Sequence, residues 1–246
     1  MGENMRRIFV VFMCVFALVA CDKHDPILPG ARTPIFSGAH INVLNKTITN
    51  APADIATVNN DNCPYTQDKN NVIWHGDKKI FSGFPTSNTV SADQHPVCSG
   101  KYVYAGLTTG EVIKVNPKNR QIAWIADIYR PSNLTGGASM VDIVAPVVPY
   151  GNFVFAGGLG DAFCKLSATD GHKYWCLDIS VAVPFIITDT YAFVVSTDDY
   201  LYAIATKNGD IYWRTPIKTQ SAPEYRNAQI MVAHETFDIA NGKKVK

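Results

Sequence analysis

An internal repeat constrains this sequence more than any other feature. Three segments align, each running from a proline to a tryptophan: Pro96–Trp124, Pro146–Trp175 and Pro184–Trp213. The interval from proline to tryptophan is nearly constant among them, and a fourth segment begins at Pro223. A self-similar period of about 40 residues, with four short strands in each period, is typical of a propeller blade. We therefore expect an all-β fold, a β-propeller of about four-stranded antiparallel blades.

The local pattern inside each unit supports strands joined by tight turns. A short β-branched and aromatic run opens each unit, and an alternating run and a strand ending in tryptophan follow. Asp170-Gly171 and Asn208-Gly209 supply the residue pairs that tolerate the positive φ of a tight hairpin. The tryptophans then fall on equivalent outer strands, where a large ring can fill the gap between neighbouring blades. The alternative for these rings is stacking on an aromatic cofactor.

The tail of each unit resembles the tryptophan-docking motif of the pyrroloquinoline-quinone-like (PQQ-like) repeat family, approximately A-x-D-x-x-x-G-x-x-x-W. The third unit has Ala203, Ala205, Gly209 and Trp213 at these positions, and the first unit ends in Trp124. The other tails depart from the motif. The second keeps Gly171 and Trp175 but has Lys165 and Ser167 at the Ala and Asp positions, and the fourth keeps Asp238 and Gly242 but has Lys246 in place of the tryptophan. The resemblance implies a structural role for Trp124, Gly171, Trp175, Gly209, Trp213 and Gly242.

The N-terminus has the pattern of an export signal. Arg6 and Arg7 precede residues 8–20, a stretch of 13 uncharged and mostly apolar residues. A membrane-spanning helix needs roughly 20 apolar residues, so this stretch matches the core of a signal peptide better. It ends in Leu18-Val19-Ala20-Cys21, which resembles a bacterial lipobox. We expect cleavage after Ala20 and diacylglycerol on Cys21; the alternative is an ordinary secretory signal that ends beside a cysteine.

These features divide the chain into three parts. Residues 1–20 are the expected lipoprotein signal peptide, and residues 21–62, which are polar with scattered prolines, are the expected flexible tether. Residues 63–246 are the expected propeller part, with repeat units 96–124, 146–175, 184–213 and 223–246. Asp22 directly after the lipidated position resembles a signal for retention in the inner membrane.

A lipobox combined with such repeats resembles the BamB-type family of outer-membrane protein assembly lipoproteins. Leu28-Pro29-Gly30-x-Arg32 resembles the alphaproteobacterial members of that family. The resemblance implies a non-catalytic scaffold, held by its lipid on the periplasmic face of the outer membrane. Its partners would be proteins of the barrel-assembly machinery, above all the central barrel-assembly protein, and neither a cofactor nor a small-molecule substrate is expected. With 22 Lys+Arg against 21 Asp+Glu, the net charge of +1 gives no reason to expect nucleic acid.

Enzyme signatures are scarce in the sequence. It contains no G-x-S-x-G elbow and no H-E-x-x-H motif, and its cysteines form no C-x-x-C pair, so no catalytic residue and no metal site is predicted. The main enzymatic alternative is a quinone-dependent dehydrogenase. Dehydrogenases of this fold have a pair of adjacent cysteines over the cofactor, and no two cysteines are adjacent here.

Two cysteines are expected to face each other across a hairpin. Cys164 and Cys176 are equally far from Asp170, at the hairpin turn, so they should be cross-strand neighbours. In an oxidising compartment they would form a disulfide, and the alternative is two free thiols. Cys63 and Cys98 would then be left as the remaining intramolecular pair beyond the signal region.

The length of 246 residues limits the propeller. At about 40 residues a blade, the eight-bladed ring of the PQQ-like family needs roughly 320 residues. We therefore expect a partial (incomplete) propeller, an open arc with exposed edge strands. The remaining alternative is a propeller fragment without a function of its own.

Overall fold

In a computed structural model of the chain, residues 41–50, 52, 55–56, 63–85, 95–128 and 142–245 are described. All of them belong to one compact unit, Ala39–Lys246. Their regular structure is β-strand throughout, and most strands form four-stranded antiparallel sheets, which confirms the predicted fold class. The predicted signal peptide over 1–20, with Ala20, and the lipid-attachment residue Cys21 lie outside the described residues.

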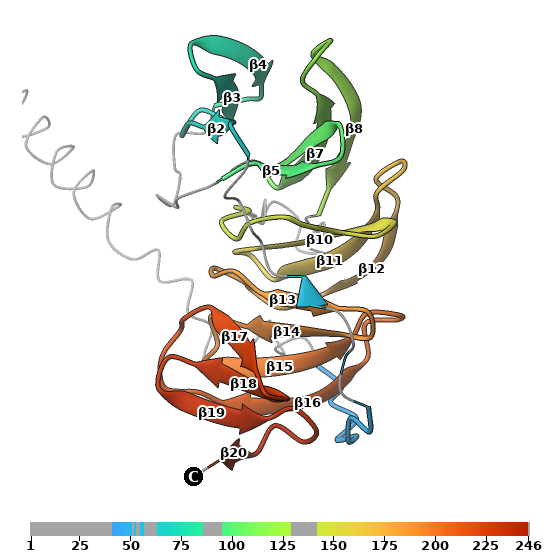
Figure 1. Cartoon of the computed structure of the whole chain (residues 1–246), viewed down its shortest axis with the longest axis vertical. Helices are drawn as coiled ribbons and strands as arrows, with labels where there is room; N and C mark the ends of the chain where they lie inside the picture. The colour runs from blue at the N-terminus through green and yellow to red at the C-terminus, as the bar shows by residue number, and fades with distance from the viewer. Residues whose placement is uncertain are drawn as a thin grey trace, which may run out of the picture. The chain divides into compact units, whose positions relative to one another are not determined.

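The described strands form five sheets, which we call blades 1 to 5 in chain order (Figure 1). Blade 1 contains β2 (Thr66–Gln67), β3 (Val72–His75) and β4 (Lys78–Ser82). Blade 2 contains β5 (Val97–Ser99), β6 (Tyr102–Gly106), β7 (Glu111–Asn116) and β8 (Gln121–Asp127). Blade 3 contains β9 (Val148–Tyr150), β10 (Phe153–Gly158), β11 (Ala162–Ser167) and β12 (Lys173–Leu177). Blade 4 contains β13 (Ile186–Thr188), β14 (Tyr191–Val195), β15 (Tyr200–Ala205) and β16 (Ile211–Pro216), with the short β1 (Ile55–Ala56) added at β13. Blade 5 contains β17 (Pro223–Arg226), β18 (Gln229–Val232), β19 (Glu235–Asp238) and β20 (Lys244–Val245).

Each pair of successive blades shares a hydrophobic core, because a central strand sends alternate side chains to opposite faces. Ala192 and Val194 of β14 join the core between blades 3 and 4. Phe193 and Val195 of the same strand join the core between blades 4 and 5. A strand covered on both faces should be buried along its whole length, and all six residues of β11 are buried, the polar Lys165 and Ser167 included. The apolar runs of the sequence therefore correspond to strands held between two neighbours.

A one-residue β-bulge recurs on the outer strand of three blades. In blade 3, Lys165 pairs with Trp175 and Leu166 with Lys173, so Tyr174 is the extra residue. In blade 4 the extra residue is Tyr212, and in blade 2 it is Ala123. A bulge lies at the same distance before the tryptophan each time, which makes the backbones of these outer strands equivalent position by position.

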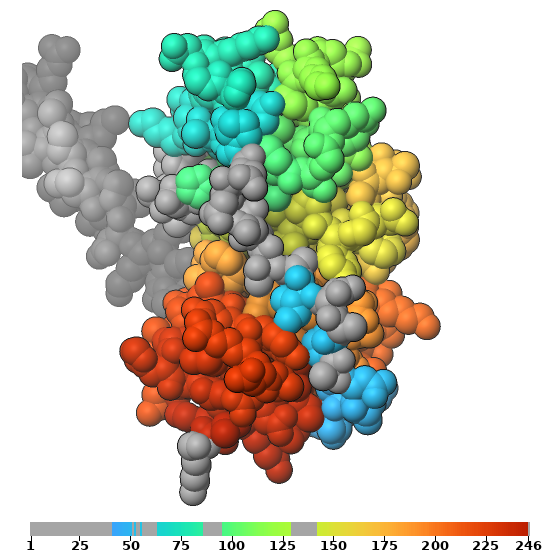
Figure 2. All heavy atoms as spheres, viewed as in Figure 1, coloured from blue at the N-terminus to red at the C-terminus, as the bar shows by residue number. Residues whose placement is uncertain are grey.

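Residues 41–46 lie along the outer edge of blade 4, where Leu44 and Lys46 donate to carbonyls of β16; in Figure 2 the blue atoms of this region lie against orange and red ones. Val43 forms a parallel bridge with Ile211. Further along, the Ile48 N–H donates to the carbonyl of Ala240 (2.8 Å), and the Ile48 side chain is 4% exposed. This part of the chain differs from the flexible tether expected over residues 21–62. The contacts join positions that are far apart in the sequence, which no local polarity pattern can indicate.

Blade 1 precedes the first predicted unit, which begins at Pro96. It has no proline-to-tryptophan segment of the repeat length, so the period alone does not locate it. A buried amide attaches it to blade 2: Asn71 Nδ2 donates to Thr108 Oγ1 (2.8 Å), and the Thr108 N–H donates to Asn71 Oδ1 (2.9 Å). Because both groups are buried and paired, they fix the position of the first sheet on its neighbour.

Candidate functional site

The contacts between neighbouring blades bring the predicted motif residues together. Trp124, Trp175 and Trp213 lie on β8, β12 and β16, and each indole spans the boundary to the next blade. Each Nε1–H donates to a backbone carbonyl there: Trp124 to Ala168 (3.2 Å), Trp175 to Thr206 (3.2 Å) and Trp213 to Ile239 (3.1 Å). The ring thus contributes buried apolar area and one fixed hydrogen bond at each boundary.

Each docked tryptophan lies against a glycine of the next blade. Gly171, Gly209 and Gly242 have φ angles of +77°, +80° and +70°, a region that glycine adopts far more easily than other residues. A Cβ at Gly171 would lie 2.8 Å from a carbon of Trp124. At Gly209 the corresponding distance to Trp175 is 3.0 Å, and at Gly242 the distance to Trp213 is 2.5 Å. Glycine is therefore favoured at these positions for two reasons: the backbone has a positive φ, and the indole leaves no room for a Cβ.

Two lysines reinforce these boundaries, and motif reasoning assigned them no role. Lys165 occupies the alanine position of the repeat tail and is 6% exposed. Its Nζ donates to the Thr206 carbonyl (2.9 Å), which also accepts from Trp175, and it lies 3.6 Å from the centroid of the Phe153 ring. Burial lowers the pKa of Lys165. The only signal in the sequence was a charged residue where the motif has alanine.

Lys114 repeats this arrangement at the preceding boundary. Its Nζ donates to the carbonyl of Ala168, the carbonyl that also accepts from Trp124, and lies 4.1 Å from the centroid of the Tyr102 ring. A lysine and a tryptophan from one blade thus converge on a single carbonyl of the next blade at two boundaries. At the third boundary, Ala203 takes the lysine position.

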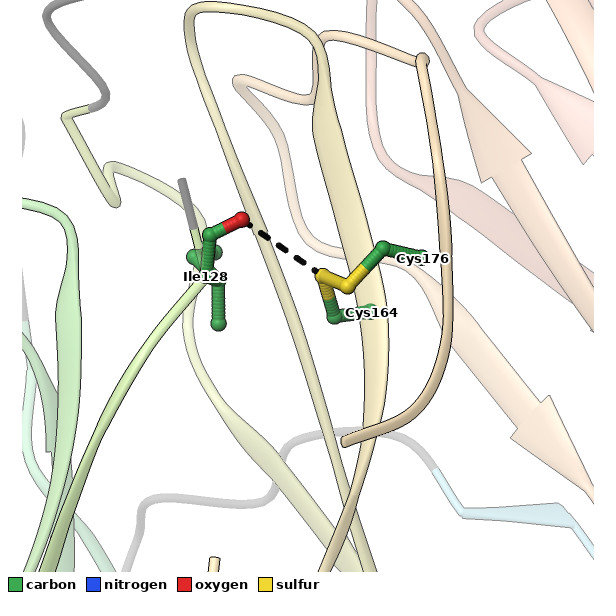
Figure 3. Close-up of a disulfide and its surroundings, with 3 residues drawn as sticks. All are labelled: Ile128, Cys164 and Cys176. Carbon is green, nitrogen blue, oxygen red and sulfur yellow. Dashed lines mark hydrogen bonds between the residues drawn. A yellow bond between two sulfur atoms is a disulfide. The ribbon is translucent and has the colours of Figure 1, made fainter. Parts of the chain in front are cut away.

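The cysteines of the blades lie in pairs. Cys164 on β11 and Cys176 on β12 are direct cross-strand partners, with a Cα–Cα distance of 4.1 Å, and a disulfide joins them (Figure 3). The Ile128 carbonyl oxygen, at the end of blade 2, lies 3.7 Å from Cys164 Sγ. A second disulfide joins Cys63 to Cys98, ahead of blade 1 and on β5. The first disulfide fixes β12, an outer strand, to the strand beside it.

The adjacent carboxylates at the turn between β14 and β15 have separate partners. Asp198 Oδ2 accepts a hydrogen bond from the Tyr202 hydroxyl (2.7 Å). Asp199 Oδ1 accepts one from Gln220 Nε2 (2.8 Å), and the φ of Asp199 is +64°. Burial, followed by the bond to Asp198, raises the pKa of Tyr202, and the hydrogen bond with Tyr202 raises the pKa of Arg214. This cluster holds a turn in place; its two acids do not face each other as an acid–base pair would.

Over the described ranges, no three His, Cys, Asp or Glu side chains gather in a way that could hold a metal ion. The same part of the chain contains no helix with the length and apolarity needed to cross a membrane.

A family model and a curated protein that match this sequence carry the same description. A family model described as "Outer membrane protein assembly factor BamB" matches residues 29–215. A curated protein with that description from Kangiella koreensis is 22% identical over 125 residues, which are 51% of this chain and 32% of that protein.

Solved structures show the same fold. The crystal structure of BamB from Moraxella catarrhalis superposes with a TM-score of 0.51 at 12% identity, covering 78% of this chain and 65% of that one. A quinohemoprotein alcohol dehydrogenase from Pseudomonas putida HK5 superposes with a TM-score of 0.56 at 12% identity, covering 74% and 40%. At these identities the likeness concerns the fold alone. The chain spans about a third of the curated relative's length and 65% of the Moraxella protein's.

Proposed function

The chain belongs to the outer membrane protein assembly factor BamB family, and from this membership we propose that it acts as a non-catalytic scaffold of outer-membrane barrel assembly. The single observation that carries the proposal is the family match, which extends from residue 29 to residue 215 and so includes blades 1 to 4. As a scaffold, it would work by binding other proteins. The partner we propose is the central barrel-assembly protein.

The contacts between blades support a scaffold role. A protein that acts by binding needs surfaces held in a fixed arrangement, because ordering a flexible surface costs affinity. Here each blade is attached to the next by a shared apolar core, and at three boundaries by an indole hydrogen bond. The loops at the strand ends are thereby presented on a rigid support.

We also propose that Cys21 carries a lipid that holds the chain on the periplasmic face of the outer membrane. The lipobox Leu18-Val19-Ala20-Cys21 supports this part of the proposal. One acyl chain gives only marginal membrane binding, whereas several give stable anchoring. Metabolic labelling with a palmitate analogue tests the lipid: we expect label on the wild type and none on Cys21→Ala.

The proposed partner is tested with purified components. The mature chain, with Cys21→Ser to keep it free of lipid, is titrated by calorimetry with the purified periplasmic domains of the central barrel-assembly protein from the same organism. We expect a saturable one-to-one isotherm. An unrelated periplasmic propeller serves as the matched control and should give no heat of binding. Absence of binding by the folded chain, at concentrations up to about 100 μM, would refute this partner.

A further inference from the structure

Two grooves of the same construction lie between blades. One lies between blades 3 and 4, encloses about 350 Å³, and is lined by residues 176–178 and 208–211 together with Ile41, Asn42 and Leu44. The other is a shallow, open depression of about 410 Å³ between blades 2 and 3, lined by residues 125–127 and 170–173. The shared register, fixed by the docked tryptophans, makes the two linings equivalent residue by residue. We call the first the occupied groove and the second the open groove.

An extended segment of the chain, which includes Ile41, Asn42 and Leu44, forms one wall of the occupied groove and pairs with the edge of β16. The Leu44 N–H donates to the Ile211 carbonyl (2.9 Å), and the Lys46 N–H donates to the Tyr212 carbonyl (2.9 Å). Leu44 lines the groove, and Lys46 Nζ lies 5.6 Å from the centroid of the Tyr212 ring. The segment therefore binds through two backbone hydrogen bonds, one aliphatic side chain, and one basic side chain over a tyrosine.

The edge of β12 beside the open groove has carbonyls and a tyrosine at the same positions, although Tyr174 is outside the lining of the groove and packs on Phe153. Lys173 and Tyr174 take the places of Ile211 and Tyr212, and the bulge at Tyr174 matches the bulge at Tyr212. Among the described strands, β12 is the last of its sheet. The carbonyls of Lys173 and Tyr174 therefore lie at the edge where an added strand would bind.

The two tyrosines share one contact, an edge-on aromatic ring of their own blade, and Tyr174 also has His172 (5.7 Å) and Lys165 Nζ (5.6 Å) beside its ring. Tyr174 packs edge-on against Phe153 at 5.4 Å, and Tyr212 packs edge-on against Tyr191 at 5.2 Å. Tyr174 nevertheless remains 55% exposed, and Ile125 in the open groove is 49% exposed. Large exposed side chains near a strand edge that pairs with no other described strand are typical of a surface that binds another chain.

We propose that the open groove binds an extended segment of a partner protein, which adds in parallel to the edge of β12. The occupied groove defines its chemistry: an aliphatic residue against Ile125, and a basic residue two positions later over Tyr174. Asp127 and Asp170 line the groove together with His172 and Lys173, so the preference for a basic residue rests on the position of Lys46 over Tyr212 and not on the charge of the lining. The inference goes beyond the proposed function, because it concerns this groove and a class of peptide, whatever protein the peptide belongs to.

The probe is a labelled synthetic peptide with the sequence of residues 41–48, Ile-Asn-Val-Leu-Asn-Lys-Thr-Ile. It is titrated into the purified mature chain with Cys21→Ser and followed by fluorescence anisotropy. A second peptide carries N-methyl groups on its Leu and Lys, which keeps the side chains but removes the two N–H donors. Because Tyr174 is largely exposed, Tyr174→Ala should melt within about 2 °C of the wild type. Tyr212→Ala is the matched control in the occupied groove.

We expect saturable binding to the wild type, weakened at least about tenfold by Tyr174→Ala and changed less than about twofold by Tyr212→Ala. N-methylation should weaken binding at least about tenfold as well, since it removes both backbone bonds. Binding that survives Tyr174→Ala, binding by the N-methylated peptide equal to that of the parent, or no saturable binding would each overturn the proposal. A dimer in sedimentation that Tyr174→Ala dissociates would also overturn it, because the occupant would then be a second copy.

Discussion

Replacing Gly171 with alanine tests the attachment of blade 2 to blade 3 through one methyl group. Gly171 adopts a φ of +77°, and its Cα faces the indole of Trp124. A Cβ at this position would lie 2.8 Å from Trp124 Cε3 and 3.0 Å from Cδ2, closer than carbon atoms pack. The substitution should therefore act through both the backbone and the blade boundary.

Gly151 provides a control that isolates the backbone part. It lies in the same blade, at the turn between β9 and β10, with a φ of +57° and nothing within 4 Å of an added Cβ. Holding alanine in this left-handed region costs about 1–2 kcal/mol. Inserting a methyl group into a packed contact costs about 1–3 kcal/mol more. We expect Gly151→Ala to lower the free energy of unfolding by about 1–2 kcal/mol and Gly171→Ala to lower it by about 2–5 kcal/mol.

Urea unfolding followed by tryptophan fluorescence measures both variants against the wild type. A third variant, Trp124→Leu, and its combination with Gly171→Ala complete a double-mutant cycle. In the Trp124→Leu background, Gly171→Ala should lower the free energy of unfolding by no more than the backbone strain alone, about 1–2 kcal/mol. Equal losses in Gly151→Ala and Gly171→Ala, or a Gly171→Ala loss unchanged by Trp124→Leu, would refute the packing argument.

Three other contacts can be tested in the same way. Cys164→Ala/Cys176→Ala opens a loop closed across 12 positions and should lower the free energy of unfolding by about 2–3 kcal/mol relative to the wild type without reductant. Reductant opens this disulfide in the wild type and has none to open at this site in the double variant, so the difference between the two proteins should shrink when reductant is present. Burial opposes ionisation of Asp68, but the hydrogen bonds that it accepts outweigh burial and lower its pKa below 3.8. Its contribution to the stability of the folded chain is therefore full above about pH 4 and is lost as the pH falls through the lowered pKa. Asp68→Asn should flatten this acid loss of stability in melting curves between about pH 5 and 2, and an unchanged slope would contradict the assignment. Tyr202→Phe removes the hydroxyl bond to Asp198 and should cost about 1 kcal/mol in urea unfolding at pH 7; no loss would show that the bond contributes nothing.

The repeat made the blades predictable because their signals are local. Alternating apolar runs, Asp-Gly or Asn-Gly turns and a tryptophan at fixed spacing each reflect one hairpin, so the positions of Gly171 and Trp175 in their blade follow from a short stretch of sequence. The cross-strand position of Cys176 opposite Cys164 followed in the same way from their distance to the turn. Patterns confined to a single blade carry this information.

The contacts that sequence reasoning missed are long-range or break the repeat. Lys165 gave no indication of the Thr206 carbonyl 41 residues away, because a lysine in a strand is ordinarily solvated. Residues 41–48 resembled a linker in polarity, yet they pair with a strand far along the chain. The open groove could not be predicted either, since it is recognised only by superposing one blade boundary on another. The binding surface of a repeat protein depends on the arrangement of its blades in space, which the repeat motif does not encode.

Affinity capture of the tagged full-length chain from detergent-solubilised membranes of its own organism tests the central claim most directly. Quantitative mass spectrometry compares the wild type with Cys21→Ala, which cannot be lipidated, and with a tagged unrelated lipoprotein. If the chain is a scaffold of barrel assembly, the wild type should enrich the central barrel-assembly protein at least about tenfold over the unrelated lipoprotein. Repeated captures in which the folded chain enriches no component of that machinery would contradict the account.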